Sequence, residues 1–322
     1  MLFVRRVAIA ATLGLGAATA VSAADYPRRP VKIIAPFGVG GPADVYSRQV
    51  AQLLSAQLRQ TFVVENRAGG TAVIGAGAVA KSAPDGYTLL AISNALTANE
   101  TLAPNRPYVL MRDFVPVATL NYSELVMVVH PSMPADDLQA FIAFARKRPG
   151  QLSYGSSGTG TPYYLAAELF KRMTGTNIVH VSFHASGDLR ETMLEGRIDM
   201  TFDAITTMAT NVHAGKVRAL GTSAAMRSKV LPDVPTIAEA GVSGFDAVLW
   251  LGIVAPAGTP QPIVNQLNAA INETIARPEI AGEWARQGAT PMTMTPAEFD
   301  AFLRKDIEKW ARVARFSGAL NH

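Results

Sequence analysis

The sequence predicts an α/β fold made of two units of similar design. The first observation is an apolar run, a glycine-rich loop and a helical pattern that follow one another over residues 31–58. The second is that the same order of segments recurs over residues 152–170. The third is the alternation of strand-like and helix-like stretches, which is typical of sheets covered by helices on both faces. With 322 residues, the chain has room for two domains of ordinary size.

The first segment predicts a place where a negatively charged group can bind. Residues 31–36 have the length and β-branching of a buried strand, and residues 37–42 are too glycine-rich for regular structure. Apolar residues then recur at helical spacing, with Pro42 and Asp44 in the first turn. Free N–H groups and the dipole at a helix start favour an anion by about 0.3–1 kcal/mol. A tight strand-to-helix turn without a ligand explains this segment equally well.

The second segment repeats the arrangement with more hydroxyl groups. Residues 152–155 predict a short strand, residues 156–160 a loop of small residues, and residues 161–170 a helix. Thr161 suits the N-cap and Pro162 the first helical position. Because hydroxyls in this loop add hydrogen-bond donors, two such loops in two α/β units favour a shared ligand.

The other apolar patterns complete the predicted fold. Alternation of strands and helices over residues 31–92 predicts a parallel sheet, and the polar stretch 121–124 between two apolar runs predicts a break that can serve as a hinge. A loose dinucleotide-binding pattern at residues 75–80 lies inside a helical pattern, so we expect no nucleotide cofactor. The predicted strands are 61–67, 87–92, 114–120, 125–130, 178–183, 198–202, 217–222 and 246–254; the predicted helices are 135–148, 188–194, 233–241, 261–276, 278–287 and 296–316.

Composition excludes several classes of protein. Hydrophobic residues make up 49% and charged residues 17% of the chain, as in globular proteins. There is no cysteine, so disulfides, thiolate nucleophiles and cysteine metal sites are impossible. The five histidines show no metal-ligand spacing, and we expect no metal and no cofactor. The net charge of +4, less the two leader arginines, is too small to indicate nucleic acid as a partner.

The N-terminus predicts export. Arg5 and Arg6 precede an apolar segment at residues 7–20 that is too short to span a bilayer, and small residues follow it. We therefore expect a signal peptide over residues 1–23, cleaved after Ala23 or Ala24. Later segments fall short of about 18 apolar residues, which predicts a soluble mature protein in the periplasm.

These residues carry a resemblance to a known family. The chain resembles the periplasmic solute receptors of tripartite tricarboxylate transporters, the Bug or TctC family, in the family's order over nearly the whole mature chain. The resembling segments are YPRRPVKIIAPFGVGGPADVYSR, FVVENRAGG, AVAKSAPDGYTLL, LSYGSSGTGTPYYLAAELFK, LEGRIDMTFD, GKVRAL, LPDVPTIAEAG and VAPAGTP. The resemblance implies a two-domain periplasmic binding protein (Venus flytrap) fold with two chain crossovers. Domain 1 would then comprise residues 24–122 and 248–322, and domain 2 residues 123–247.

The resemblance also implies a carboxylate ligand and delivery to a membrane permease by a receptor that we expect to be monomeric. Two departures concern the site. The usual second proline of the first loop is absent, and in the loop at residues 183–187 His184 stands where the family commonly has lysine. The expected ligand-binding residues are Phe37, Gly38, Val39, Gly40, Gly41, Ala43, Asp44, Ser93, Asn94, Ser156, Ser157, Gly158, Thr159, Thr161, His184, Ser186 and Asp203.

Neither loop holds Lys or Arg, so the sequence predicts that backbone dipoles and hydroxyls, with water, bind the carboxylate without a buried ion pair. Asp203, at a strand end, is expected to bind a ligand hydroxyl or amine or to orient loop N–H groups; a helix cap explains it equally well. Ser93 and Asn94 line the cleft or form a solvated turn. His184 either meets the far end of the ligand or is simply exposed.

Two other function classes stay open. A ligand-sensing subunit of a signalling system has the same sequence features as a transport receptor. A secreted hydrolase is disfavoured because residues 155–159 do not satisfy the Gly-x-Ser-x-Gly pattern, Thr159 taking the last position. We therefore expect no catalytic residues.

Overall fold

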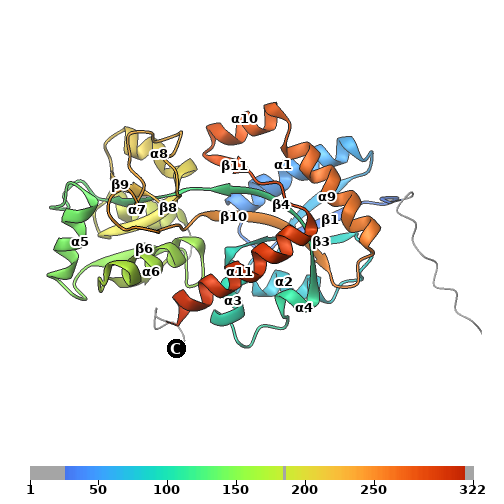
Figure 1. Ribbon diagram of the computed structural model, residues 1–322, viewed down its shortest axis with the longest axis horizontal. Helices are drawn as coiled ribbons and strands as arrows, with labels where there is room; N and C mark the ends of the chain where they lie inside the picture. The colour runs from blue at the N-terminus through green and yellow to red at the C-terminus, as the bar shows by residue number, and fades with distance from the viewer. Residues whose placement is uncertain (1–25, 184–185, 316–322) are drawn as a thin grey trace, which may run out of the picture.

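The computed structural model describes residues 26–183 and 186–315. The predicted signal peptide and His184 lie outside the described residues. Two β-sheets, of six and five strands, form two units (Figure 1). The first sheet lies to the right in that view and the second to the left, and the long strands β4 and β10 extend between them.

The first sheet has the strand order β11-β4-β10-β3-β1-β2. Strand β1 is parallel to β2 and β3, as predicted from the alternating pattern. The complete sheet is mixed, because β10, which was not part of that pattern, comes from late in the chain and pairs antiparallel with both β3 and β4. The strands are β1 (Val31–Ala35), β2 (Phe62–Asn66), β3 (Thr88–Ser93), β4 (Phe114–Ser123), β10 (Leu249–Pro256) and β11 (Ala289–Pro291).

The second sheet has the order β7-β6-β8-β5-β9 and is also mixed. Strand β6 is parallel to β7 and β8, whereas β5 is antiparallel to β8 and β9. The strands are β5 (Leu125–Val129), β6 (Ser153–Ser156), β7 (Val179–Ser182), β8 (Met200–Ala204) and β9 (Arg218–Thr222).

Helices cover both faces of the sheets (Figure 1). Their buried faces follow the predicted apolar spacing; in α1, for example, Val50 and Leu54 are fully buried. The helices are α1 (Pro42–Gln57), α2 (Val73–Ala80), α3 (Asn94–Leu102), α4 (Leu110–Asp113), α5 (Leu138–Arg146), α6 (Pro162–Thr174), α7 (Ser186–Leu194), α8 (Ile205–His213), α9 (Gln261–Ile275), α10 (Pro278–Arg286) and α11 (Pro296–Ala314).

Several expectations about local structure need correction. Residues 121–123 are not part of a polar break but the end of β4, since Asn121 and Ser123 pair with Leu251 and Leu249. The helix predicted over residues 233–241 is a single turn. There Thr236 and Glu239 cap each other's backbone N–H groups, and Gly241 ends the turn at φ +105°. Helices α3 and α8 and strand β11 were not predicted from the sequence.

The two connections between the sheets leave the first sheet side by side. Ser123, the last residue of β4, pairs with Leu249, the first residue of β10. Leu125 begins β5 of the second sheet only two residues later. The chain therefore passes between the sheets at residue 124 and again before residue 249.

Helix α11 packs against elements of both units, namely α3 and β4 of the first and α6 of the second. Its buried Asp306 accepts hydrogen bonds from the Thr97 hydroxyl (2.6 Å) and from the indole nitrogens of Trp250 and Trp310 (both 3.0 Å). Burial raises the pKa of Asp306 to about 6. This carboxyl group thus ties α11 to α3 and β10 in the first unit.

Candidate functional site

The loop after β1, residues 37–41, is shaped by the side chain of Asp44. Its carboxylate accepts hydrogen bonds from the Gly40 N–H (2.9 Å), the Asn66 amide (2.9 Å) and the Arg48 guanidinium (2.9 Å). Burial tends to raise the pKa of Asp44, but the hydrogen bonds from Gly40 and Asn66 and the charge of Arg48 outweigh it and lower that pKa. Asp44 is 3% exposed, so its carboxylate serves chiefly to fix the loop.

The rest of this loop faces outward. Val39 is 78% exposed, and Cβ atoms added at Gly38 or Gly40 would meet no atom within 4 Å. Gly40 has φ +79°, a conformation that favours glycine. Gly41 is the N-cap of α1 and brings no side-chain hydrogen bond to the first turn. The backbone N–H groups at the start of α1 are therefore available to a bound group.

The loop after β6, residues 156–160, is fixed by its own hydroxyls. The Ser156 hydroxyl lies 2.7 Å from Nε2 of His180 and accepts from the Gly158 N–H (3.2 Å). Thr161 donates to the Gly158 carbonyl (2.7 Å) and caps the Tyr164 N–H of α6, as its N-cap position predicts. Within the described chain, the hydroxyls of the partly exposed Ser157 and exposed Thr159 make no hydrogen bond, so they can donate to a ligand.

His180 is held by aromatic rings beneath this loop. Its ring stacks on Tyr154 with centroids 4.9 Å apart and meets Tyr164 edge-on at 4.9 Å. Burial, with the nearby charge of Lys171, lowers the pKa of His180 to about 4, so the ring is neutral at neutral pH. Since Ser156 is 0% exposed, this close Ser–His contact positions the loop and does not present a nucleophile.

The second loop touches the first unit through a segment that sequence reasoning did not assign to the site. The Thr71 hydroxyl donates to the Thr159 carbonyl (3.1 Å), and the Asn99 amide of α3 donates to the Thr71 carbonyl (2.8 Å). A Cβ at Gly160 would lie 3.4–3.6 Å from atoms of Leu102, Thr71 and Asn99. Thr71 itself has a positive φ of 49°, a strained conformation of the kind found at binding sites.

The ends of β3 and β8 supply the other predicted residues. Ser93 is not in a loop: it caps α3 by accepting from the Ala95 N–H (3.2 Å), and Asn94 begins that helix. Asp203 is 1% exposed and pairs with Arg190 of α7, with N–O distances of 2.6 and 3.2 Å. Asp203 also accepts from the Ala204 N–H, but the alternative of a helix cap is wrong, because Ala204 is the N-cap of α8 and no side chain caps that helix.

Arg190 was missed by sequence reasoning and corrects the expectation that the region lacks fixed cations. Burial lowers its pKa, but the hydrogen bond and charge of Asp203 outweigh burial and raise it. Its charge also acts on Tyr163 at the start of α6, so the cation lies near the second loop. His184 lies outside the described residues, and the side chain of Ser186, the first residue of α7, is likewise not described.

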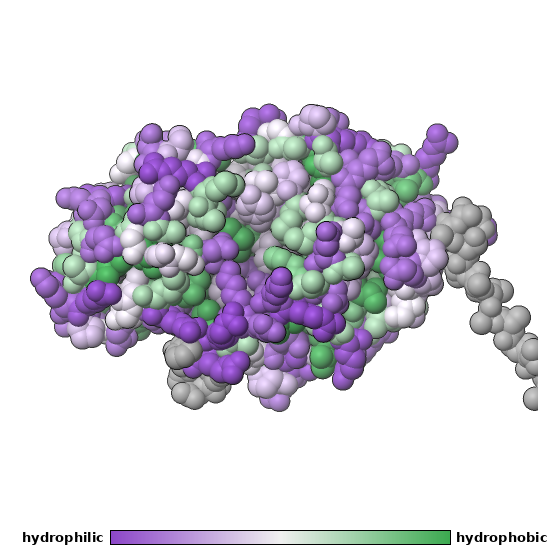
Figure 2. Space-filling view, viewed as in Figure 1, coloured by the Kyte–Doolittle hydropathy of each residue, from purple (hydrophilic) through white to green (hydrophobic). Residues whose placement is uncertain are grey.

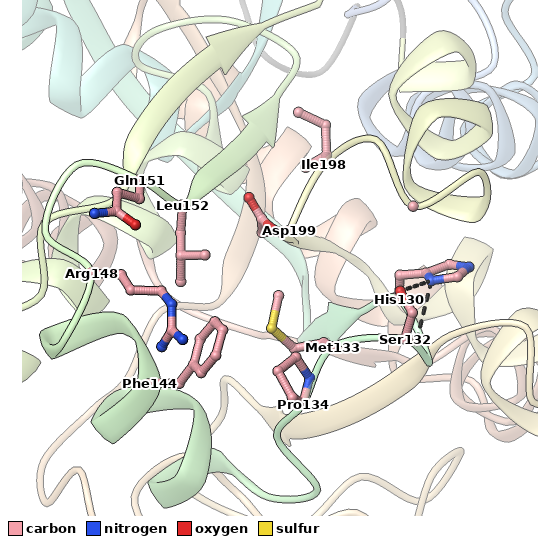
Figure 3. A pocket seen from close by; sticks show the side chains of 11 residues that line it. His130, Ser132, Met133, Pro134, Phe144, Arg148, Gln151, Leu152, Ile198 and Asp199 are labelled. Carbon is pink, nitrogen blue, oxygen red and sulfur yellow. Dashed lines mark hydrogen bonds between the residues drawn. The ribbon is translucent and has the colours of Figure 1, made fainter.

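A hollow of about 300 Å³ lies elsewhere, at the opposite ends of the strands of the second sheet. It is lined from the end of β5, from α5 and from the residues before β6 and β8. Figure 3 shows Arg148 beside the ring of Phe144, and Asp199 pointing toward Leu152. Because the loop at residues 156–160 and the start of α8 lie at the other ends of β6 and β8, this hollow is not the predicted cleft.

The described residues contain neither a candidate metal cluster nor a helix that could cross a membrane. Over residues 26–183 and 186–315, His, Asp and Glu form no group of three arranged to hold a metal ion. The helices of the same ranges are too short or too polar to cross a membrane.

Known proteins share both the sequence and the architecture. A profile described as "Tripartite tricarboxylate transporter family receptor" matches residues 46–318. Protein BugT of Bordetella pertussis is 38% identical over 306 residues, covering 94% of each chain. A UPF0065 protein in the tcbD-tcbE intergenic region of Pseudomonas sp. is 36% identical, covering 89% of this chain and 86% of that protein.

Solved structures agree. An R. palustris protein with adipate superposes with a TM-score of 0.84 at 34% identity, covering 91% of this chain and 99% of that one. MatC from Rhodopseudomonas palustris with bound malate gives a TM-score of 0.80 at 31% identity, covering 89% and 99%. The matching neighbours have the two-domain periplasmic binding protein fold that the sequence predicted. This chain therefore belongs to the receptor family of the tripartite tricarboxylate transporters.

Proposed function

We propose that this chain captures a small organic carboxylate between the loops 37–41 and 156–160 and delivers it to the membrane subunits of a tripartite tricarboxylate-type transporter. One observation carries the proposal. Each of the two sheets has a loop of small residues that follows the carboxyl end of a strand and leads into a helix. The second of these loops contacts the first unit through the hydrogen bond between Thr71 and Thr159. The related proteins bound to adipate and malate support a carboxylate as the ligand.

The carboxylate is held mainly by neutral donors. The uncapped start of α1 offers backbone N–H groups, and Ser157 and Thr159 offer hydroxyls. Neither loop contains Lys or Arg, and the nearby Arg190 is already paired with Asp203. Binding by dipoles avoids the desolvation of a full ion pair, which can cost as much as the pair returns.

The proposal includes the location and the mode of action. After removal of the signal peptide the receptor works in the periplasm as a monomer, with domain 1 at residues 24–122 and 248–322 and domain 2 at residues 123–247. It binds without catalysing a reaction. On the face in Figure 2, hydrophobic residues are interspersed with hydrophilic ones over both units, as on the surface of a monomer.

Calorimetry on protein stripped of ligand by unfolding and refolding tests the proposal. Mono-, di- and tricarboxylates and aromatic acids form the panel, with the corresponding methyl esters as matched uncharged controls. We expect micromolar or tighter binding of at least one acid and none of its ester. Failure of every acid to bind contradicts the proposal. Capture of a membrane kinase, and not of transporter subunits, from native membranes would assign the receptor to sensing instead.

A further inference from the structure

We propose that Asn121, together with Asn94 and Ser47, forms a second polar subsite that binds a hydroxyl or primary carboxamide group at the end of the ligand remote from its carboxylate. The inference rests on the proposed carboxylate function and adds the chemistry of the ligand's other end. It concerns residues of the first unit, of which only Asn94 was predicted from the sequence to bind ligand.

Each of the three side chains is buried and has at least one polar atom without a hydrogen-bond partner within the described chain. Asn121 is 0% exposed, and neither its amide oxygen nor its amide nitrogen makes a hydrogen bond within the described chain. The amide oxygen of Asn94 and the hydroxyl of Ser47 also have no hydrogen-bond partner within the described chain. Buried polar groups are nearly always paired, so such a group calls for a partner from outside the chain.

The register of the first sheet places Asn121 at the same end of the sheet as the loop 37–41, with β10 and β3 between β4 and β1. Asn121 pairs with Leu251, which pairs with Ser93, and directly paired residues point to the same face. Leu251 packs in one cluster with Tyr46 and Val50, so this face is the one that α1 covers. Continuing the β1–β3 register by three residues sets Phe37 level with Ser93.

Asn94 and Ser47 lie around the same strand ends. The Asn94 amide donates to the carbonyl of Val248 (3.3 Å), the residue before the start of β10. Ser47 is in the second turn of α1, the helix that the first loop opens, and next to it Tyr46 lies near Ser123 at the end of β4. The unpartnered atoms therefore come from α1, β4 and α3, at the same end of the sheet as residues 37–41.

The missing partners must both donate and accept. Asn121 offers a donor and an acceptor, and because the Asn94 nitrogen is used by Val248, its oxygen remains as a second acceptor. A carboxylate only accepts hydrogen bonds and would leave both amide oxygens unpaired. A hydroxyl or a primary carboxamide satisfies both kinds of atom.

Charge supports the same choice. Glu124, which directly follows β4, is partly buried, and one of its carboxyl oxygens has no hydrogen-bond partner within the described chain. Its pKa is raised by burial, which the nearby Ser228 hydroxyl only partly offsets. Because Glu124 follows Asn121 by three residues, a second anion at this end of the ligand would lie in the same region as a carboxyl group, which disfavours it.

Calorimetry with matched acids tests the inference. The probes are straight-chain acids of four to six carbons that carry at their far end a methyl, a hydroxyl, a carboxamide or a second carboxylate. We expect the hydroxy or amide acids to bind wild type about tenfold more tightly than the methyl acid, which corresponds to about 1.4 kcal/mol. In Asn121→Leu that ratio should fall to about one, because leucine keeps the branching and the number of side-chain heavy atoms but loses both polar atoms.

Asn272→Leu serves as the matched control. Asn272 also has an amide oxygen without a partner, but it lies on α9 and its nitrogen donates to Met294. Its replacement should lower the melting temperature and leave the selectivity ratio unchanged. Asn121→Leu, which breaks no hydrogen bond, should keep the melting temperature of the ligand-free protein.

Three results would overturn the inference while leaving carboxylate binding intact. These are tightest binding of the methyl acid or the diacid, a selectivity ratio that survives in Asn121→Leu, and a large loss of stability in ligand-free Asn121→Leu. Binding of no acid in any panel would instead contradict the proposed function, so the two failures can be told apart.

Discussion

Gly40 and Gly38 provide a matched pair for testing the first loop. In both positions an added Cβ would meet no atom within 4 Å, so neither substitution by alanine creates a clash. Only Gly40 has a left-handed backbone, with φ +79°. Any difference between Gly40→Ala and Gly38→Ala therefore reports the backbone conformation of the loop.

The magnitude follows from that conformation. A left-handed residue other than glycine costs about 1–2 kcal/mol. If the ligand requires the loop as it stands, this cost weakens binding by about 5–30-fold in Gly40→Ala. In Gly38→Ala no such cost arises, and the reduced freedom of the unfolded chain makes the protein equally stable or more stable by about 0.4–1 kcal/mol.

Titration calorimetry with the tightest acid and urea unfolding of the ligand-free proteins measure the two effects separately. In Gly40→Ala the exposed loop can relax locally, so we expect most of the cost in the dissociation constant and little in the unfolding midpoint. Wild-type affinity in Gly40→Ala, or an equal loss in both variants, would refute a role for the loop backbone in binding.

Three further predictions concern other parts of the molecule. Thr71→Val removes the hydrogen bond to the Thr159 carbonyl and should weaken ligand binding in calorimetry about threefold, whereas Thr71→Ser should bind as wild type. Equal affinities of Thr71→Val and wild type would contradict a role for this contact. His180→Phe keeps the ring stacked on Tyr154 but loses the acceptor for Ser156, so calorimetry should show binding weakened about three- to tenfold. Because the pKa of His180 is about 4, the ring stays neutral between about pH 6 and 8, and wild-type affinity should not change with its protonation over that range. A step in wild-type affinity in that range that vanishes in the variant would contradict this. Because the pKa of Asp306 is raised to about 6, its contribution to stability is present below about pH 4 and is lost as pH rises through 6. The free energy of unfolding of wild type should therefore fall by about 2 kcal/mol relative to that of Asp306→Asn between about pH 4.5 and 7.5. If urea unfolding gives the same difference between the two proteins at both pH values, the raised pKa of this carboxyl group is wrong.

The sequence predicts the parts of the fold whose pattern is local. Pro42 and Pro162 mark the starts of α1 and α6, and the apolar spacing that follows each places both helices within a few residues of their observed bounds. Strands β1 and β3 are equally clear, because each is a short apolar run ended by small or polar residues, whereas β6, Ser153–Ser156, is indicated by its place before a loop of small residues and a helix start. These elements also set the two loops of the proposed site.

The errors arise where distant partners decide the local structure. Asn121 and Ser123 are poor strand formers, yet β10, from 130 residues further along the chain, pairs with them and makes them strand. Helix α3 begins with Asn94 and has no strong apolar spacing, but Asp306 of α11 binds Thr97 and helps to hold it in place. No pattern within either segment could have revealed these partners.

For the proposed site, the sequence predicted where the two loops lie but not the contacts of the side chains around them. The positions of the two loops follow from strand ends and helix starts, whereas the pairing of Arg190 with Asp203 needs α7 and β8 to meet in space. Thr71 gave no sequence signal beyond its place after two glycines, because its left-handed backbone is imposed by contacts with Asn99 and Thr159.

The adjacent exits of β4 and β10 govern how the halves of the receptor can move. Two neighbouring polypeptide connections bend easily about the line that joins them, but they resist rotation of one half about the long axis of the molecule. We expect the two halves to open and shut about one axis, which would return residues 156–160 to the same place on the first half at each cycle. A single axis would give the closed form one repeatable shape.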